Sequence, residues 1–211
     1  MIALNEDSDE PPPRLFLARG KVSYEIWFRT DVSEEMAQAC RAIAADLPPW
    51  DGGEPPRALY DRLRAALTRD TDITAQAAGP AFRFGARVEL PTDAEVRLID
   101  AASAHLLERF FPYTRSVLAS RRPVVGVVVD GAVVSACYSA RSRPTAAEAG
   151  VDTEEPHRRK GLGALVVSRW RDALEAEGRA PLYSTTWDNH ASLAVARRLG
   201  LIAYADTLSI T

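Results

Sequence analysis

A basic, glycine-containing loop at the start of a helix constrains the fold of this 211-residue chain more than any other feature. Segment 157–164 reads HRRKGLGA, so three cations precede two glycines. Residues 146–153 before it can run as an extended strand. Apolar residues recur after it at helical spacing, at Leu165, Val166, Trp170 and Leu174. We expect Gly178 to end this helix. The first amides of a helix lack partners and carry the positive end of its dipole, so the pattern predicts a phosphate or pyrophosphate site.

Two better-known phosphate loops do not match this segment. A P-loop carries its lysine directly after the second glycine, whereas Lys160 precedes Gly161. A dinucleotide-binding loop has a third glycine or alanine where Val166 stands, and an acidic ribose ligand near Pro181. Nucleotide binding of either kind is therefore not indicated.

The spacing Arg158-x-x-Gly161-x-Gly163 resembles the R/Q-x-x-G-x-G/A signature of the GNAT superfamily, the acyl-CoA-dependent N-acetyltransferases. In that family the loop binds the pyrophosphate of CoA. The resemblance implies acetyl-CoA as the co-substrate and an amine as the acceptor.

A second segment is similar to the closing motif of the same family. Asn189 and Ser192 fit its N-x-x-[AS] part, and Gly200 precedes Leu201, which stands where the family usually has phenylalanine. Asn189 is expected to cap a helix that Gly200 ends, and residues 202–210 to form a last strand. The resemblance covers roughly residues 80–211.

The resemblance implies an α/β fold with a mixed, mostly antiparallel twisted sheet flanked by helices, in which acyl-CoA lies where two strands splay apart. We divide the chain into a disordered acidic and proline-containing terminus (1–13), an N-terminal α/β extension (14–79) and a GNAT-like domain (80–211). The extension contributes packing, substrate shape or a homodimer contact.

The resemblance also assigns cofactor-binding residues. Strand residues Val151, Asp152 and Thr153 are expected to hydrogen-bond the pantetheine arm, and Asn189 to contact the cofactor. The pyrophosphate is expected on the loop, at Arg158, Arg159, Lys160, Gly161, Leu162, Gly163 and Ala164. The alternative is a solvated helix start, but three cations there oppose the helix dipole unless an anion is bound.

Catalysis requires a group that accepts the proton of the attacking ammonium. Glu148 is the candidate base, because it precedes the loop among small apolar residues and many family members carry a glutamate there. The alternative is an edge position facing solvent. The usual tyrosine acid is replaced by Ala196, which leaves Tyr183 and Tyr204 as substitutes, although each also fits a packed strand residue.

Composition narrows the classes further. A net charge of −3 disfavours a general nucleic-acid surface. The two cysteines and three histidines fit no metal or disulfide pattern, and this usage favours a reducing cytoplasm. No signal-peptide or membrane-length apolar run is present, so we expect no membrane partner.

Outside the motifs, the pattern predicts a hairpin of strands 124–129 and 132–138 around Asp130-Gly131. A capping box at Thr92–Glu95 predicts a helix, whose apolar face would be Val96, Ile99, Leu106 and Phe110.

The extension is expected to hold a strand at 22–28, a helix behind Ser33, a second helix from Arg57 and a short strand at 73–77. Its proline loop, residues 48–56, either lines a substrate pocket or is a plain surface connection.

The sequence therefore predicts an N-acetyltransferase that moves an acetyl group from acetyl-CoA to an amine. The alternative is a catalytically degenerate module of the same fold that binds acyl-CoA as a sensing or interaction domain. Ala196 favours the alternative and Glu148 opposes it. No motif identifies the acceptor amine.

Overall fold

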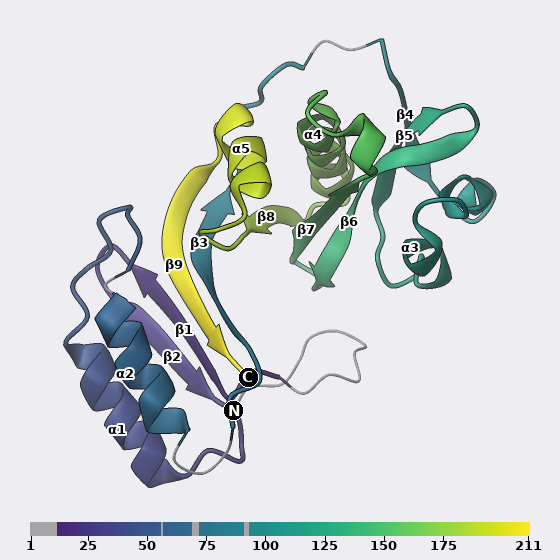
Figure 1. Cartoon of the computed structure of the whole chain (residues 1–211). Coiled ribbons are helices and arrows are strands. Elements are labelled where there is room, and N and C mark those ends of the chain that lie inside the picture. Colours follow the sequence, from purple (N-terminus) through teal and green to yellow (C-terminus); the bar gives the residue numbers. More distant parts are fainter. Residues whose placement is uncertain (1–11, 56, 69–71, 91–92) are drawn as a thin grey trace. The chain divides into compact units, whose positions relative to one another are not determined.

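The computed structural model describes residues 12–55, 57–68, 72–90 and 93–211. The chain forms two compact units. The first comprises Met1–Phe82, Ser184–His190 and Ala203–Thr211, and the second comprises Arg83–Tyr183 and Ala191–Ile202. The described part of the chain holds nine strands, mostly antiparallel, with helices packed on them, so the predicted α/β class is confirmed (Figure 1). Most of the segment predicted as disordered, residues 1–11, lies outside the described residues.

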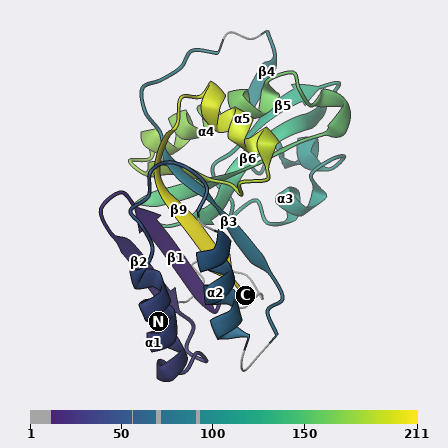
Figure 2. The ribbon, with the colours of Figure 1, turned by 60° about the vertical axis from the view of Figure 1, so that its left-hand side comes forward.

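The first unit is a sheet covered by two helices. Its strands are β1 (Leu15–Gly20), β2 (Tyr24–Phe28), β3 (Gln76–Arg83) and β9 (Ile202–Ile210), in the spatial order β2-β1-β9-β3. Strand β1 pairs antiparallel with both β2 and β9. Helices α1 (Glu34–Ala45) and α2 (Arg57–Leu67) run side by side and pack their apolar faces on the sheet (Figure 2).

Both helices of the extension are confirmed. The Ser33 hydroxyl accepts the Met36 amide at 3.2 Å and caps α1 as predicted. The buried core between helices and sheet is made by Leu15, Leu17, Met36, Cys40, Leu63, Leu67, Leu208 and Ile210.

The strand predicted at 73–77 instead begins at Gln76 and continues through Gly79-Pro80 to Arg83. Thr74 donates its amide to the carbonyl of Thr211 outside any strand ladder. Gly79 suits the strand because a Cβ there would lie 1.9 Å from the Thr185 carbonyl oxygen, so only glycine permits this approach of two backbones. The predicted domain boundary at residues 79 and 80 falls inside β3, whereas the compact units change at residues 82 and 83.

The second unit contains β4 (Glu95–Ile99), β5 (Val124–Val129), β6 (Ala132–Ser142), β7 (Ala146–Thr153) and β8 (Ala180–Ser184), in the order β8-β7-β6-β5-β4. The predicted hairpin of β5 and β6 is confirmed. Asp130 and Gly131 both have positive φ, 48° and 74°, as a tight hairpin turn requires.

The helix predicted after Thr92 is wrong. Thr92 lies outside the described residues, and Glu95–Ile99 forms β4, which pairs antiparallel with β5. A short 3₁₀ turn, Ala104–Leu107, and helix α3 (Pro112–Ser116) follow. The apolar run of β5 offers a ladder partner and a buried surface, and these tertiary contacts override the local helical spacing.

Helix α4 (Leu162–Ala176) is the predicted helix behind the basic loop. Trp170 is fully buried on it and donates its indole N–H to the Ser139 hydroxyl of β6 at 3.3 Å. Gly178 follows the helix with φ of 74°, which confirms the predicted stop. Helix α5 (His190–Arg198) and strand β9 also lie where they were predicted. No helix in the described parts of the chain is both long and apolar enough to cross a membrane.

Candidate functional site

The basic loop connects β7 to α4 through a short 3₁₀ turn, Glu155–His157. Arg159 and Gly161 both adopt left-handed backbone conformations, with φ of 61° and 79°. The Leu165 amide donates to the Gly161 carbonyl at 3.2 Å and is the first bond of the helical ladder. The amides of the residues between Gly161 and Leu165 therefore have no acceptor within the helix, which is the arrangement that binds anions.

The two loop glycines serve different purposes. At Gly161 an added Cβ would lie 2.2 Å from Nη1 of Arg198, and the positive φ also disfavours a side chain. At Gly163 an added Cβ would make ordinary contacts, the nearest at 3.5 Å to Val195. The geometry thus requires glycine at the first position and accepts alanine at the second.

The three loop cations are exposed, but they do not all have the same surroundings. Arg158 donates Nε to the carbonyl oxygen of Thr153 at 2.9 Å, so its side chain folds back and braces the end of β7. Arg159 and Lys160 directly precede the helix start. His157 carries a buried Nδ1 without a hydrogen-bond partner among the described residues. This nitrogen is therefore available to hydrogen-bond a ligand at the loop. These features fit a pyrophosphate.

Strand β7 changes its neighbours along its length. It pairs with β6 as far as Thr153, but its parallel pairing with β8 covers only Ala146–Glu148. From Ala149 to Thr153 the ladder on the β8 side is open within the described part of the chain. Backbone groups of the three predicted pantetheine-binding residues, 151–153, lie in this stretch, and they suit an extended amide-containing chain as the missing partner.

The side chains of this stretch are engaged with β6. The Asp152 carboxylate accepts the Tyr138 hydroxyl at 2.9 Å, and the hydroxyls of Thr153 and Ser135 lie 2.8 Å apart. These bonds fix the strand while its backbone faces the opening between β7 and β8.

Glu148 lies on β7 at the last residue that pairs with β8. Its Oε1 accepts Nη1 of Arg141, which stands opposite on β6, at 2.6 Å. The Glu148 side chain is 22% exposed and that of Arg141 is 62% exposed. The ion pair explains how a carboxylate is tolerated on a central strand, so the cost of burial no longer argues by itself for catalysis. Its role as the base stays a prediction.

The two candidate acids differ in their environments. Tyr183, on β8, is buried, and its hydroxyl lies 2.6 Å from the Ser192 hydroxyl on α5. Burial raises the pKa of Tyr183 to about 12. Ala196 lies one turn after Ser192 on the same face of α5 and is buried. The Tyr183 hydroxyl is thus held against the helix face that lacks the expected tyrosine. Tyr204, on β9 in the first unit, is 43% exposed.

Asn189 stands directly before α5, in the N-cap position that the sequence predicted, and its amide donates to the Thr186 carbonyl at 3.2 Å. It belongs to the first unit. Contact with a cofactor stays a prediction for this residue.

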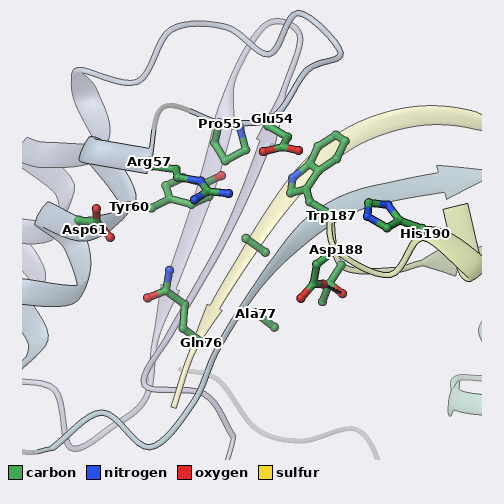
Figure 3. A pocket seen from close by; sticks show the side chains of 12 residues that line it. Glu54, Pro55, Arg57, Tyr60, Asp61, Gln76, Ala77, Trp187, Asp188 and His190 are labelled. Atoms are coloured by element: carbon green, nitrogen blue, oxygen red, sulfur yellow. Dashed lines mark hydrogen bonds between the residues drawn. The ribbon is translucent and has the colours of Figure 1, made fainter.

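Sequence reasoning missed a second polar site, a pocket of about 530 Å³ in the first unit (Figure 3). Its wall includes Tyr60 and Trp187, and both bind the fully buried carboxylate of Asp206. Arg19 pairs with the same carboxylate at 3.3 Å. Glu54, from the proline loop, also lines it, whereas Trp50 of that loop is buried. The sequence signals were the proline loop, one of whose two interpretations was a pocket wall, and an aspartate inside the apolar strand at 202–210.

Among the described residues no group of three or more His, Cys, Asp or Glu side chains is placed to hold a metal ion.

Comparisons with known proteins identify the family. The family model described as GNAT acetyltransferase matches residues 94–205, more than half of the chain. The chain is therefore a member of the GNAT acetyltransferase family. A comparison with curated proteins finds no match.

Solved structures show the same fold at low sequence identity. A GCN5-related N-acetyltransferase-like protein from Streptococcus suis is 17% identical, with a TM-score of 0.53 over 98% of this chain and 87% of that one. A GNAT-family acetyltransferase from Colwellia psychrerythraea is 9% identical, with a TM-score of 0.53 over 88% and 75% of the two chains.

Proposed function

We propose that this protein is an N-acetyltransferase that transfers the acetyl group of acetyl-CoA to the amino group of a small molecule or peptide. The observation that carries the proposal is the start of α4, where left-handed Gly161 leaves the next three amides without acceptors beside Arg159 and Lys160. Membership of the GNAT family supports the same reaction. In it a C–N bond forms, the C–S bond of the thioester breaks, and the ammonium proton ends on a base or on the departing thiolate.

The chain's own residues divide this work. The free amides of the α4 start hold the pyrophosphate, and the open stretch of β7, at 151–153, positions the pantetheine arm. Glu148 accepts the proton of the ammonium, with Arg141 holding the carboxylate in place. Tyr183, which burial keeps protonated, acts as the acid in place of the tyrosine that Ala196 replaces.

A degenerate, acyl-CoA-binding module is the second candidate. It is favoured by Ala196 at the usual tyrosine position and by the ion pair that occupies Glu148. In such a module Glu148 has a purely structural role.

Binding and turnover separate the two candidates. At about 100 times the dissociation constant, acetyl-CoA adds about 2.7 kcal/mol and is expected to raise the melting temperature by roughly 5–10 °C. CoA is expected to act similarly, and NAD and ATP much less. Release of free thiol is then measured with a panel of amines. A stabilising effect of acetyl-CoA without thiol release from any amine would support the module.

Glu148→Gln tests the enzymatic reading directly. We expect a loss of about 10²–10⁴-fold in turnover, because a general base contributes that much, while acetyl-CoA binding stays nearly unchanged. Equal turnover in the variant would exclude Glu148 as the base.

We also propose a cytoplasmic location, which is supported by two cysteines, Cys40 and Cys137, that are both buried and free. A homodimer contact through the N-terminal residues remains part of the proposal and is tested by the mass of the protein in solution.

A further inference from the structure

The pocket of the first unit is built from segments that are far apart in the sequence. Its lining comes from the proline loop, from α2, from the start of β3 and from the turn before α5, as Figure 3 shows. Its volume of about 530 Å³ lies within the range of small-molecule sites. We call it the Trp187 pocket.

Hydrogen bonds to Asp206 hold the two aromatic residues of the Trp187 pocket in place. The Trp187 indole N–H donates to Oδ1 of Asp206 at 3.0 Å, and the Tyr60 hydroxyl donates to Oδ2. Arg19 donates to the same Oδ2 at 3.3 Å and, through its other terminal nitrogen, to the carbonyl of Pro48 at 3.3 Å. Three donors on two oxygens, one of them the guanidinium of Arg19, favour the ionised carboxylate. Both rings and the proline loop are therefore held in place before any ligand arrives.

This anchoring determines what the two rings can offer a ligand. The N–H of Trp187 and the hydroxyl of Tyr60 are both used by Asp206. Tyr60 is only 3% exposed, so what remains for a ligand is mainly the partly exposed ring of Trp187, which suits alkyl groups and the face-on approach of a cation. Polar recognition has to come from the other lining residues.

Those residues are predominantly acidic. Glu54, Asp61 and Asp188 contribute three carboxylates, and Arg57 is the only lysine or arginine among the described lining residues. The Thr186 hydroxyl donates to Asp188, and this bond lowers the pKa of Asp188. Glu54 and Asp61 form no ion pair within the described part of the chain. Leaving His190 aside, the lining carries a formal net charge of −2.

We propose that the Trp187 pocket binds a small organic diamine that is protonated at both nitrogens, with its carbon spacer on Trp187 and its ammonium groups at the carboxylates. Two positive charges match the excess of carboxylates over the single guanidinium. Binding at this site goes beyond the proposed acetyl transfer, since it involves only residues of the first unit and is measured without acyl-CoA.

The test uses the full-length protein and 1,5-diaminopentane as the probe. Binding is followed by calorimetry and by the NMR signal of the Trp187 indole N–H, assigned with Trp187→Phe. We expect the diamine to bind and to shift that signal, pentylamine to bind more weakly, and 1,5-pentanediol, a neutral molecule of similar shape, not to bind. Equal binding of pentylamine or pentanediol, or an unmoved indole signal at millimolar diamine, would overturn the inference.

Matched substitutions locate the charge. Glu54→Gln and Asp188→Asn keep side-chain shape at exposed positions, and each is expected to weaken diamine binding about two- to fivefold, the size of a partly exposed ion pair. Glu35→Gln makes the same charge change on an exposed residue of α1 outside the pocket and is expected to leave affinity unchanged. Unchanged affinity in both pocket variants, or an equal loss in Glu35→Gln, would refute the site.

Discussion

Substitution of the two loop glycines by alanine separates the backbone requirement of the cofactor loop from its packing. Gly161 has φ of 79°, and a non-glycine residue in the left-handed region costs about 1–2 kcal/mol. Its Cβ would also press on Nη1 of Arg198, the far end of a flexible side chain that can move. Gly163 has room for a Cβ and lies in the first turn of α4, where alanine is the better helix former by up to about 1 kcal/mol.

The cost of the strained torsion in Gly161→Ala can appear in the affinity for acetyl-CoA or in the stability of the free protein. If the free loop relaxes, acetyl-CoA has to restore the left-handed turn and binds about 5- to 30-fold more weakly. If the loop keeps its shape, the free energy of unfolding falls instead. The loss in binding and the loss in stability should therefore sum to about 1–2 kcal/mol.

Calorimetry with acetyl-CoA and thermal unfolding of the free protein measure the two losses. Gly163→Ala is the matched control and is expected to bind like the wild type with an equal or higher melting temperature. Unchanged affinity and unchanged stability in Gly161→Ala would contradict this prediction, as would an equal loss of binding in Gly163→Ala.

Three further outcomes follow from the contacts of single side chains. Arg141→Gln frees the Glu148 carboxylate from its ion pair, and thiol release should fall by less than the about 10²–10⁴-fold expected for loss of the base itself; a larger loss would show that Arg141 acts in the reaction. Tyr183→Phe should slow thiol release without weakening acetyl-CoA binding, and an unchanged rate would remove Tyr183 as the acid. Burial raises the pKa of Asp206, so between its ordinary and its raised pKa the native state binds more protons than the unfolded state. The free energy of unfolding should therefore fall as the pH rises through that window, and urea titrations of Asp206→Asn should lack this slope. The same variant should lose about 3–5 kcal/mol because Arg19 is left buried without its charge partner.

The cofactor loop could be predicted from the sequence because every part of it is local. The glycines, the cations and the apolar spacing of α4 lie within one contiguous segment, and a left-handed torsion such as that of Gly161 is typical of glycine itself. The hairpin at Asp130-Gly131 was predictable for the same reason.

The failed prediction after Thr92 shows where local patterns stop being informative. Val96 and Ile99 have a spacing that fits one face of a helix, but the five residues of β4 pair with the apolar strand β5 and Ile99 is buried there. That choice depends on residues about 30 positions away in the sequence, and no local pattern contains it.

The Trp187 pocket could not be predicted because its anchoring residues are far apart in the sequence. Its anchor joins Arg19, Tyr60, Trp187 and Asp206, which come from the beginning, the middle and the end of the chain. Each has an ordinary local explanation as a strand or helix residue. Only in the folded first unit do they meet, at the carboxylate of Asp206.

The core of the first unit combines residues from both ends of the chain. Strand β1 lies between β2 and β9, and Leu208 and Ile210 of β9 are fully buried with Leu15 and Leu17. Burying each of the two β9 side chains contributes about 1.5–3 kcal/mol, so together they are a large fraction of the about 5–15 kcal/mol that stabilises a typical domain. The N-terminal strands and helices therefore cannot complete their core until residues 205–210 of β9 pair with β1. The N-terminal extension, in which the sequence shows no motif with chemistry, thus depends on β9 at the end of the chain. Asp206 on β9 also supplies the buried carboxylate that anchors the Trp187 pocket.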